Sequence, residues 1–160
     1  MQKWVITIVC LLILIGGGLF AYFYQTIRSS INEQEQLAVQ RVLSDTDITT
    51  VEEVSIYHGT KPYTVILGQS KENRVVAWVG NEEERIIVKN AKDGLRKEEV
   101  KQFALAELAP KKLIAIRLGM ENHLPIYEIT YLDENDRYTF YYITFEDGTF
   151  VKRYSLKAKD

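Results

Sequence analysis

The hydrophobic pattern begins with one long apolar run. Residues 4–24 contain no charged side chain. As a helix rising about 1.5 Å per residue, this run covers roughly 31 Å, close to the thickness of the hydrocarbon core of a bilayer. Trp4 stands at one end and Tyr22 and Tyr24 at the other, as is typical of residues at a membrane interface. The pattern predicts a single transmembrane helix within an N-terminal anchor, residues 1–28.

A cleaved signal peptide is the competing interpretation of this run, with Lys3 in its charged region. However, the run exceeds a usual signal core, and no A-x-A-like site follows it. Cys10 lies inside the apolar core, which does not fit a lipoprotein signal. Basic residues flank both ends almost equally, at Lys3 and Arg28, so the flanking charges leave the orientation open. The short N-terminus favours a C-terminal part outside the cytoplasm.

After the anchor, the pattern changes to one helix and several short strands. Residues 29–44 have helical periodicity, and Ser30 and Glu33 have the spacing of a capping box. Whether this helix is continuous with the anchor helix stays open. Alternating runs typical of strands follow at 51–58, 62–69, 73–80 and 84–89. Ser70 and Asn73 bound a turn between two of these runs.

The same order then starts again. Residues 95–108 predict a second helix, with Glu98 and Glu99 in its first turns, where the helix dipole favours acid, and with Pro110 just beyond its end. Its apolar stripe is Val100, Phe103, Ala104 and Leu108. Strand-like runs follow at 112–119, 124–133, 136–145 and 148–156, with turn signals at 133–136 and 146–148.

The two halves match at one constant offset. The matching pairs are Pro62 with Pro125, Ile66 with Ile129, Arg74 with Arg137, and Trp78 with Tyr141. The sequence therefore predicts an α+β fold with two modules, residues 29–89 and residues 90–160, each with one helix packed on an antiparallel meander. The polar linker at 90–94 is short, so we expect the modules to touch or nearly touch.

Composition limits the chemistry that these modules can perform. The chain has 20 Lys and Arg against 22 Asp and Glu, which is no electrostatic footprint for nucleic acid. Its single cysteine, Cys10, lies in the predicted membrane helix and leaves no disulfide or cysteine metal site for the modules. His58 and His123 each stand next to a turn and lack further ligands at suitable spacing. We therefore expect no metal and no cofactor.

No catalytic motif emerges from the sequence. There is no G-x-S-x-G, no S-x-x-K in a suitable context and no calcium-loop spacing in the acidic clusters. Paired carboxylates for sugar hydrolysis stay open, although modules this small leave little room for a cleft. The prediction is a protein that is not an enzyme.

The candidate binding surface lies on the run 138–145, which is apolar on both faces. One face has to cover the second helix, and the other either binds a partner or packs against the first module. Tyr127 and Tyr131 on the neighbouring run would widen that second face. The candidate protein-binding residues are Tyr127, Tyr131, Tyr138, Phe140, Tyr141, Tyr142 and Phe145.

An anchor followed by two helix-plus-meander modules, with a polar turn before Arg74 and again before Arg137, resembles a known bacterial family. It is similar to the TseB-like (YpmB-like) membrane-anchored proteins with tandem cystatin-like, PepSY-related domains. Residues 93–100, DGLRKEEV, look like the start of a PepSY-type module. The resemblance implies an extracytoplasmic, single-pass protein of the cell membrane, associated with cell-wall elongation and with a peptidoglycan-synthesising penicillin-binding protein. It implies no catalytic residues.

The sequence and the resemblance together lead to two functional hypotheses. The first is a non-enzymatic, membrane-anchored adaptor or regulator, whose anchor raises its effective concentration beside a membrane-bound penicillin-binding protein. The alternative is a PepSY-type protease inhibitor or folding assistant at the cell surface.

Overall fold

The computed structural model describes residues 33–81 and 85–157. The predicted anchor at residues 4–24, like the capping position Ser30, lies outside these described residues. Among the residues that are described, no helix is long and apolar enough to cross a membrane. By its internal contacts the chain divides into Met1–Leu37 and Ala38–Asp160, and the second unit carries both sheets.

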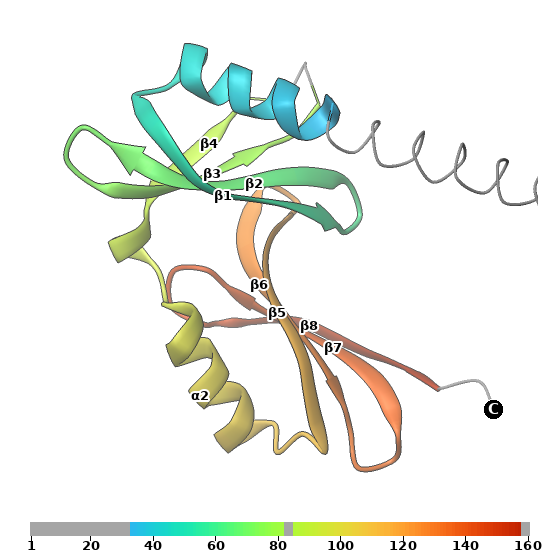
Figure 1. Ribbon diagram of the computed structural model, residues 1–160. Helices are drawn as coiled ribbons and strands as arrows, with labels where there is room; N and C mark the ends of the chain where they lie inside the picture. Colours follow the sequence, from blue (N-terminus) through green and yellow to red (C-terminus); the bar gives the residue numbers. More distant parts are fainter. Residues whose placement is uncertain (1–32, 82–84, 158–160) are drawn as a thin grey trace, which may run out of the picture. The chain divides into compact units, whose positions relative to one another are not determined.

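The first sheet is a four-stranded antiparallel meander (Figure 1). Residues 33–45 before it are helical. The strands follow in the order β1 (Ile48–His58), β2 (Pro62–Ser70), β3 (Arg74–Val79) and β4 (Ile87–Asn90). The order and number of elements agree with the sequence pattern, although β4 has only four residues and starts later than expected.

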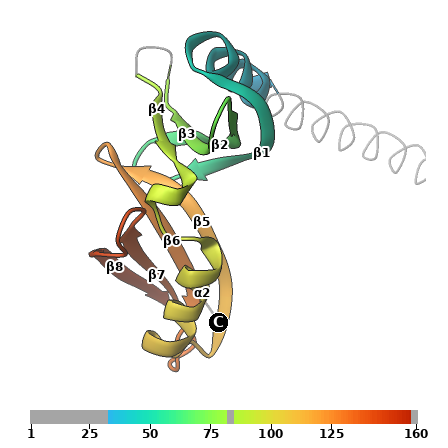
Figure 2. The same ribbon diagram turned by 90° about the vertical axis from the view of Figure 1, so that its left-hand side faces the viewer.

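The second sheet repeats this order after a short connection. A 3-10 turn, η1 (Ala91–Asp93), leads to helix α2 (Lys97–Glu107), which lies beside the second sheet (Figure 2). The strands are β5 (Lys112–Glu121), β6 (Leu124–Leu132), β7 (Arg137–Thr144) and β8 (Phe150–Lys157), again an antiparallel meander. The prediction of an α+β chain with two antiparallel sheets is confirmed.

The turns obey the local chemistry of their sequences. The Ser70 amide donates to the Asn73 carbonyl at 2.8 Å, which closes the turn between β2 and β3. Between β6 and β7, Asp136 adopts a left-handed φ of 55°, while the Asp133 carboxylate accepts the Asn135 and Arg137 amides at 2.9 and 3.0 Å. Gly148 supplies the left-handed residue, at φ 75°, of the turn before β8.

The central strands of the first sheet, β2 and β3, are largely buried on both faces. On one face Ala38 and Val42 of the first helix pack against Ile66, Ala77 and their neighbours. The opposite face belongs to a second cluster that includes Trp78 and residues of the second sheet and α2. The strict alternation of β3 explains this arrangement, because successive residues of a strand point to opposite faces.

The two sheets therefore share a core, as the short linker predicts. Trp78 of β3 is fully buried, and its ring meets Phe145 edge to face with the centroids 5.3 Å apart. Met120, Ile126 and Tyr127 of the second sheet belong to the same cluster. The predicted stripe of α2 is also confirmed, since Val100 and Ala104 are fully buried there, with Phe103 and Leu108 packed against them.

Candidate interaction surface

The predicted aromatic residues lie on two different faces of the second sheet. Tyr141 and Phe145 lie on the face that α2 covers, and the pairing of β6 with β7 places Tyr127 opposite Ile143 and Tyr131 opposite Thr139, on that same face. Tyr127 and Tyr131 therefore do not widen the second face. The structure brings together only Tyr138, Phe140 and Tyr142 on the face opposite α2, which we call the open face.

The covered face is filled by core contacts. Phe145 lies 6.0 Å from Tyr127 between ring centroids, and a Cβ at Gly94 would come within 2.3 Å of its ring. Tyr127 donates its hydroxyl to the Leu95 carbonyl at 2.7 Å. Burial, together with nearby glutamates of α2, raises the pKa of Tyr127 to about 12. These residues hold the second sheet to α2 and to the first sheet.

The open face carries a ladder of side chains across β7 and β8. Phe140 stacks on Tyr154 with the ring centroids 4.9 Å apart and the planes 18° apart. Two residues further along the same face, Tyr138 of β7 pairs with Leu156 of β8. Tyr138, Tyr154 and Leu156 remain 45%, 44% and 55% exposed. We call Tyr138, Phe140, Tyr154 and Leu156 the aromatic ladder. Exposed aromatic groups of this kind are typical of protein-binding surfaces.

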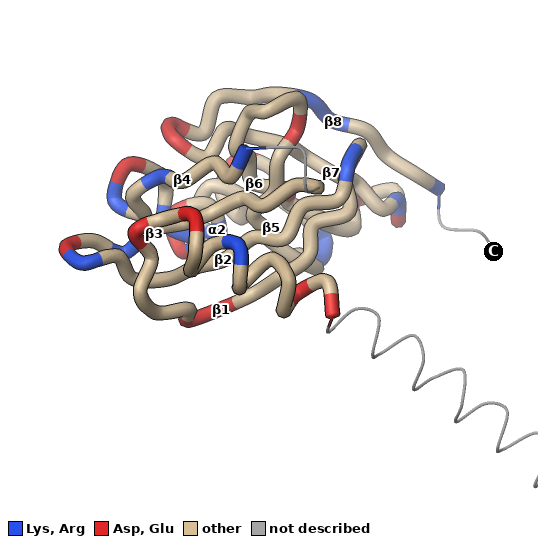
Figure 3. The backbone as a smooth tube through the Cα atoms, turned by 90° about the horizontal axis from the view of Figure 1, so that it is seen from above, with Lys and Arg blue, Asp and Glu red and all other residues tan. Residues whose placement is uncertain are grey.

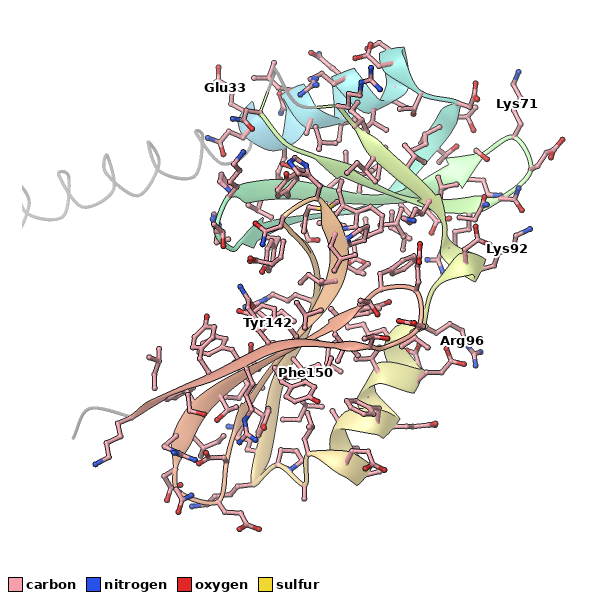
Figure 4. All side chains as sticks on the ribbon, turned by 180° about the vertical axis from the view of Figure 1, so that it is seen from behind. Glu33, Lys71, Lys92, Arg96, Tyr142 and Phe150 are labelled. Carbon is pink, nitrogen blue, oxygen red and sulfur yellow. The ribbon has the colours of Figure 1, made fainter. Side chains whose placement is uncertain are left out.

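At one end of the ladder, Tyr142 (labelled in Figure 4) is buried and contacts polar side chains. Its hydroxyl donates to Glu128 Oε2 at 2.8 Å and lies 3.1 Å from the Tyr154 hydroxyl. The ammonium of Lys152 lies 4.6 Å from the centre of its ring. Burial raises the pKa of Tyr142 well above its ordinary value, and its hydrogen bonds with Tyr154 and Glu128 raise it further.

Glu121, at the end of β5, ties the two sheets together. It accepts hydrogen bonds from the Tyr57 hydroxyl at 2.8 Å, from the Thr60 hydroxyl at 2.8 Å and from Lys152 Nζ at 2.9 Å. Burial alone would raise the pKa of this carboxyl, but the hydrogen bonds from Lys152, Tyr57 and Thr60 outweigh it and lower the pKa to about 2. Glu121 is therefore a buried anion whose partners come from both sheets.

Close backbone approach makes this junction possible. Gly119 of β5 lies under the ring of Tyr57, where a Cβ would come within 2.6 Å of the ring carbons. Burial, followed by the hydrogen bond and charge of Glu121, raises the pKa of Tyr57 strongly. The neutral phenol therefore acts as a fixed hydrogen-bond donor to Glu121.

Sequence reasoning missed Glu121 and Glu128, and also the ladder members Tyr154 and Leu156. A signal for Glu128 exists, because it is the one charged residue in the mostly hydrophobic strand LPIYEITYL. Such a residue has to find a partner when the strand is buried. Tyr154 and Leu156 could not be assigned to a face without the pairing of β7 with β8.

A pocket of about 460 Å³ lies between the two sheets and the start of α2. Its rim carries charges of both signs, and Arg96 of this rim is labelled in Figure 4. Part of the rim is neutralised locally, since Arg74 pairs with Glu52 and Arg96 with Glu99. Within residues 33–81 and 85–157, no group of three or more His, Cys, Asp or Glu could hold a metal ion.

Comparison with known proteins places these features in a family context. The "Cell wall elongation regulator TseB-like domain" matches residues 38–80, which hold the end of the first helix and strands β1 to β3. The chain is 25% identical over 134 residues to a Bacillus subtilis (strain 168) protein described as "Probable cell wall elongation regulator TseB", covering 82% of this chain and 83% of that protein.

A solved structure supports the same relationship. The chain matches the "YpmB protein from Bacillus subtilis" with a TM-score of 0.71 and 25% sequence identity, over 76% of this chain and 96% of that one. Because this coverage exceeds either sheet with its helix, the likeness extends across both sheets. The resemblance to the TseB-like (YpmB-like) proteins is thus shown by sequence and by fold.

Proposed function

We propose that this TseB-like protein is a non-enzymatic regulator or adaptor of cell-wall elongation. The observation that carries the proposal is the similarity, over most of the chain, to a protein described as a cell wall elongation regulator. The match of residues 38–80 to the domain of the same description agrees with it. A regulator acts through a partner, and we propose a membrane-bound, peptidoglycan-synthesising penicillin-binding protein.

The proposal places the protein at the cell membrane, with its sheets outside the cytoplasm. Residues 4–24 are long and apolar enough to form a single membrane helix, with residues 1–28 as the anchor. We assign the rest to two cystatin-like, PepSY-related modules, residues 29–89 and residues 90–160. Confinement to the membrane surface would raise the effective concentration of these modules near a membrane-bound partner.

The open face of the second sheet is the surface that we propose for the partner. Of the seven candidate residues, Tyr138 and Phe140 are accessible on this face, and Tyr154 and Leu156 extend it. Tyr142 sits below them in its hydrogen-bond network and holds the ladder in position. Four side chains of this size, clustered across two strands, provide the anchors that dominate binding energy in protein interfaces.

Crosslinking of the full-length chain in intact membranes tests the function. We expect the captured protein to be a penicillin-binding protein, and we expect capture to decrease when residues 1–28 are deleted. Recovery of no cell-wall synthase would contradict the cell-wall assignment, and capture unchanged by the deletion would contradict tethering. Inhibition of an external metalloprotease by the purified protein would instead favour a PepSY-type inhibitor.

A pair of single variants tests the surface. Tyr154→Ala removes the stacking partner of Phe140 and should reduce capture, because a ladder residue is lost. Leu105→Ala removes a side chain of α2 that is 52% exposed, outside the open face, and should leave capture unchanged. Equal effects of the two variants would exclude the open face as the binding surface.

A further inference from the structure

Strand β8 is an edge strand of the second sheet. The strand order is β5-β6-β7-β8, so among the described residues β8 pairs on one side only, with β7. An edge strand exposes a row of backbone N–H and C=O groups that can pair with another chain. Proteins usually protect such edges against the addition of a strand from another chain.

The other edges are irregular or short. Strand β1 has register shifts between Ile48 and Thr50 and between Val51 and Glu53, and β5 has one after Leu113. Strand β4 has four residues. These bulges and short lengths are common protections against strand addition.

Strand β8 lacks these protections over most of its length. Its one register shift lies at its start, where Phe150 pairs with Ile143, and residues Lys152 to Lys157 then pair regularly with β7. Its sequence, FVKRYSLK, contains no proline. Residues 152–157 thus form a regular edge that an incoming strand can extend.

The side chains of β8 add apolar surface to this edge. Phe150, Tyr154 and Leu156 are 56%, 44% and 55% exposed. Tyr154 and Leu156 lie on the open face, so every second side chain of an incoming strand would lie beside the aromatic ladder. Phe150 lies on the opposite face, against Tyr141.

The charge of β8 selects the incoming segment. Lys152, Arg153 and Lys157 are its only charged residues, and no acidic residue lies between Phe150 and Lys157 (Figure 3). Lys152 is paired with Glu121, whereas Arg153 and Lys157 form no salt bridge with the described carboxylates. Like charges repel a second β8, but they attract an acidic strand.

We propose that β8 is a docking strand that accepts an extended segment of a partner protein by strand addition, the segment alternating acidic with apolar residues. This inference rests on the proposed function, in which the protein acts through a protein partner. Backbone hydrogen bonds between the two strands provide the affinity. The aromatic ladder and the side chains of Arg153 and Lys157 provide the selectivity for the partner segment.

The direct test uses the full chain and a synthetic peptide of alternating glutamate and valine, as long as β8. We expect saturable binding, with amide hydrogen exchange slowed along β8. The double variant Arg153→Glu, Lys157→Glu should weaken binding by roughly tenfold or more, because attraction becomes repulsion. Lys112→Glu, on the opposite edge strand β5, is the charge-reversal control and should bind as the wild type does.

Several results would overturn the inference. Equal binding of a lysine–valine peptide would remove the charge selection, and protection at β1 or β5 in place of β8 would assign another edge. Binding to vesicles of anionic lipid but to neither peptide would make the basic strand a membrane contact. Self-association that the double variant abolishes would make a second copy the occupant.

Capture in intact membranes separates this inference from the proposed function. If the double variant folds and captures the penicillin-binding protein as well as the wild type does, the docking strand is wrong while the function stands. If the wild type captures no cell-wall synthase but binds the acidic peptide at β8, the docking strand stands and the proposed partner is wrong. Unfolding midpoints of the variants verify that each one is folded.

Discussion

The two sheets have the same strand order, and each follows a helix of its own, but their faces are covered to different extents. The first sheet is covered on both sides, by Ala38 and Val42 on one face and by the shared core on the other. The second sheet is covered by α2 on one face, and on the other it carries the exposed aromatic ladder. A duplicated pattern has thus produced one sheet whose central strands are buried on both faces and one sheet that presents an exposed aromatic surface.

Equivalent positions of the repeat account for much of this difference. Trp78 in the first half is fully buried against Phe145, whereas its counterpart Tyr141 is half-buried against Phe103 and Phe150. A tyrosine tolerates partial exposure because its hydroxyl can reach water, whereas Trp78 is enclosed on every side. The buried contact of Trp78 with Phe145 therefore fixes the second sheet against the first.

The largest expected loss of stability comes from truncating Trp78, which packs between the two sheets. Trp78→Ala should lower the free energy of unfolding by roughly 3–5 kcal/mol, since it leaves a cavity between the sheets. Trp78→Phe should cost clearly less, because the indole N–H makes no hydrogen bond among the described residues. Urea unfolding measures both changes. Equal losses would mean that ring volume is not what the core requires.

The next effect concerns the anion that joins the sheets. Glu121→Gln keeps the shape but removes the charge that Lys152, Tyr57 and Thr60 stabilise, and it should cost roughly 2–3 kcal/mol at neutral pH. The folded pKa, about 2, lies below the ordinary 4.5. The stabilisation is therefore complete above the ordinary pKa and is lost as the pH falls towards 2.

Unfolding measured from neutral to acidic pH checks this prediction. The gap between wild type and Glu121→Gln should be constant down to about pH 5 and should narrow below it. Asp133→Asn is the matched control, since burial raises the pKa of Asp133 but the hydrogen bonds from Arg137 and Asn135 outweigh it and lower that pKa to about 2 as well. Hydrogen exchange should then increase at the β6–β7 turn for Asp133→Asn, and at the junction of the sheets for Glu121→Gln.

The sequence was sufficient for the elements because each follows from a local pattern. The alternation of residues 73–80, the stripe of α2 and the turns at Ser70 and Gly148 all depend on near neighbours, and all agree with the structure. The contact between the sheets was also expected, because the linker is short. Local periodicity and turn chemistry are readable in one sequence.

The surface was harder to predict because it depends on pairing between distant strands. Four of the seven candidates, Tyr127, Tyr131, Tyr142 and Phe145, are buried, and Tyr154 and Leu156 were missed. A one-residue change in register moves a side chain to the other face, and register is not visible in composition. The network around Glu121 was missed for the same reason, since it joins residues of three strands and a turn.

Close packing between the sheets gives a smaller effect. Gly119→Ala should cost roughly 1–3 kcal/mol, because the new methyl group meets the ring of Tyr57. If that contact is the cause, Tyr57→Ala should remove most of the penalty of Gly119→Ala in a double-mutant cycle. Additive losses would instead show that Gly119 is needed by its own strand and not by the first sheet.

The smallest effect separates two equivalent arginines of the repeat. Arg74 pairs across strands with Glu52, and both side chains are well exposed, so Arg74→Ala should change stability by about 0.5 kcal/mol or less. Arg137 pairs with Asp133, which is buried and also accepts two backbone amides of its own turn. Arg137→Ala should therefore cost more than Arg74→Ala, since it leaves a buried carboxylate without its cation. Chemical unfolding at low salt compares the pair, and added salt should reduce the Arg74 effect further. Equal losses of stability would mean that the two arginine ion pairs stabilise their sheets to the same extent. The contrast between the two sheets would then rest on the aromatic positions alone.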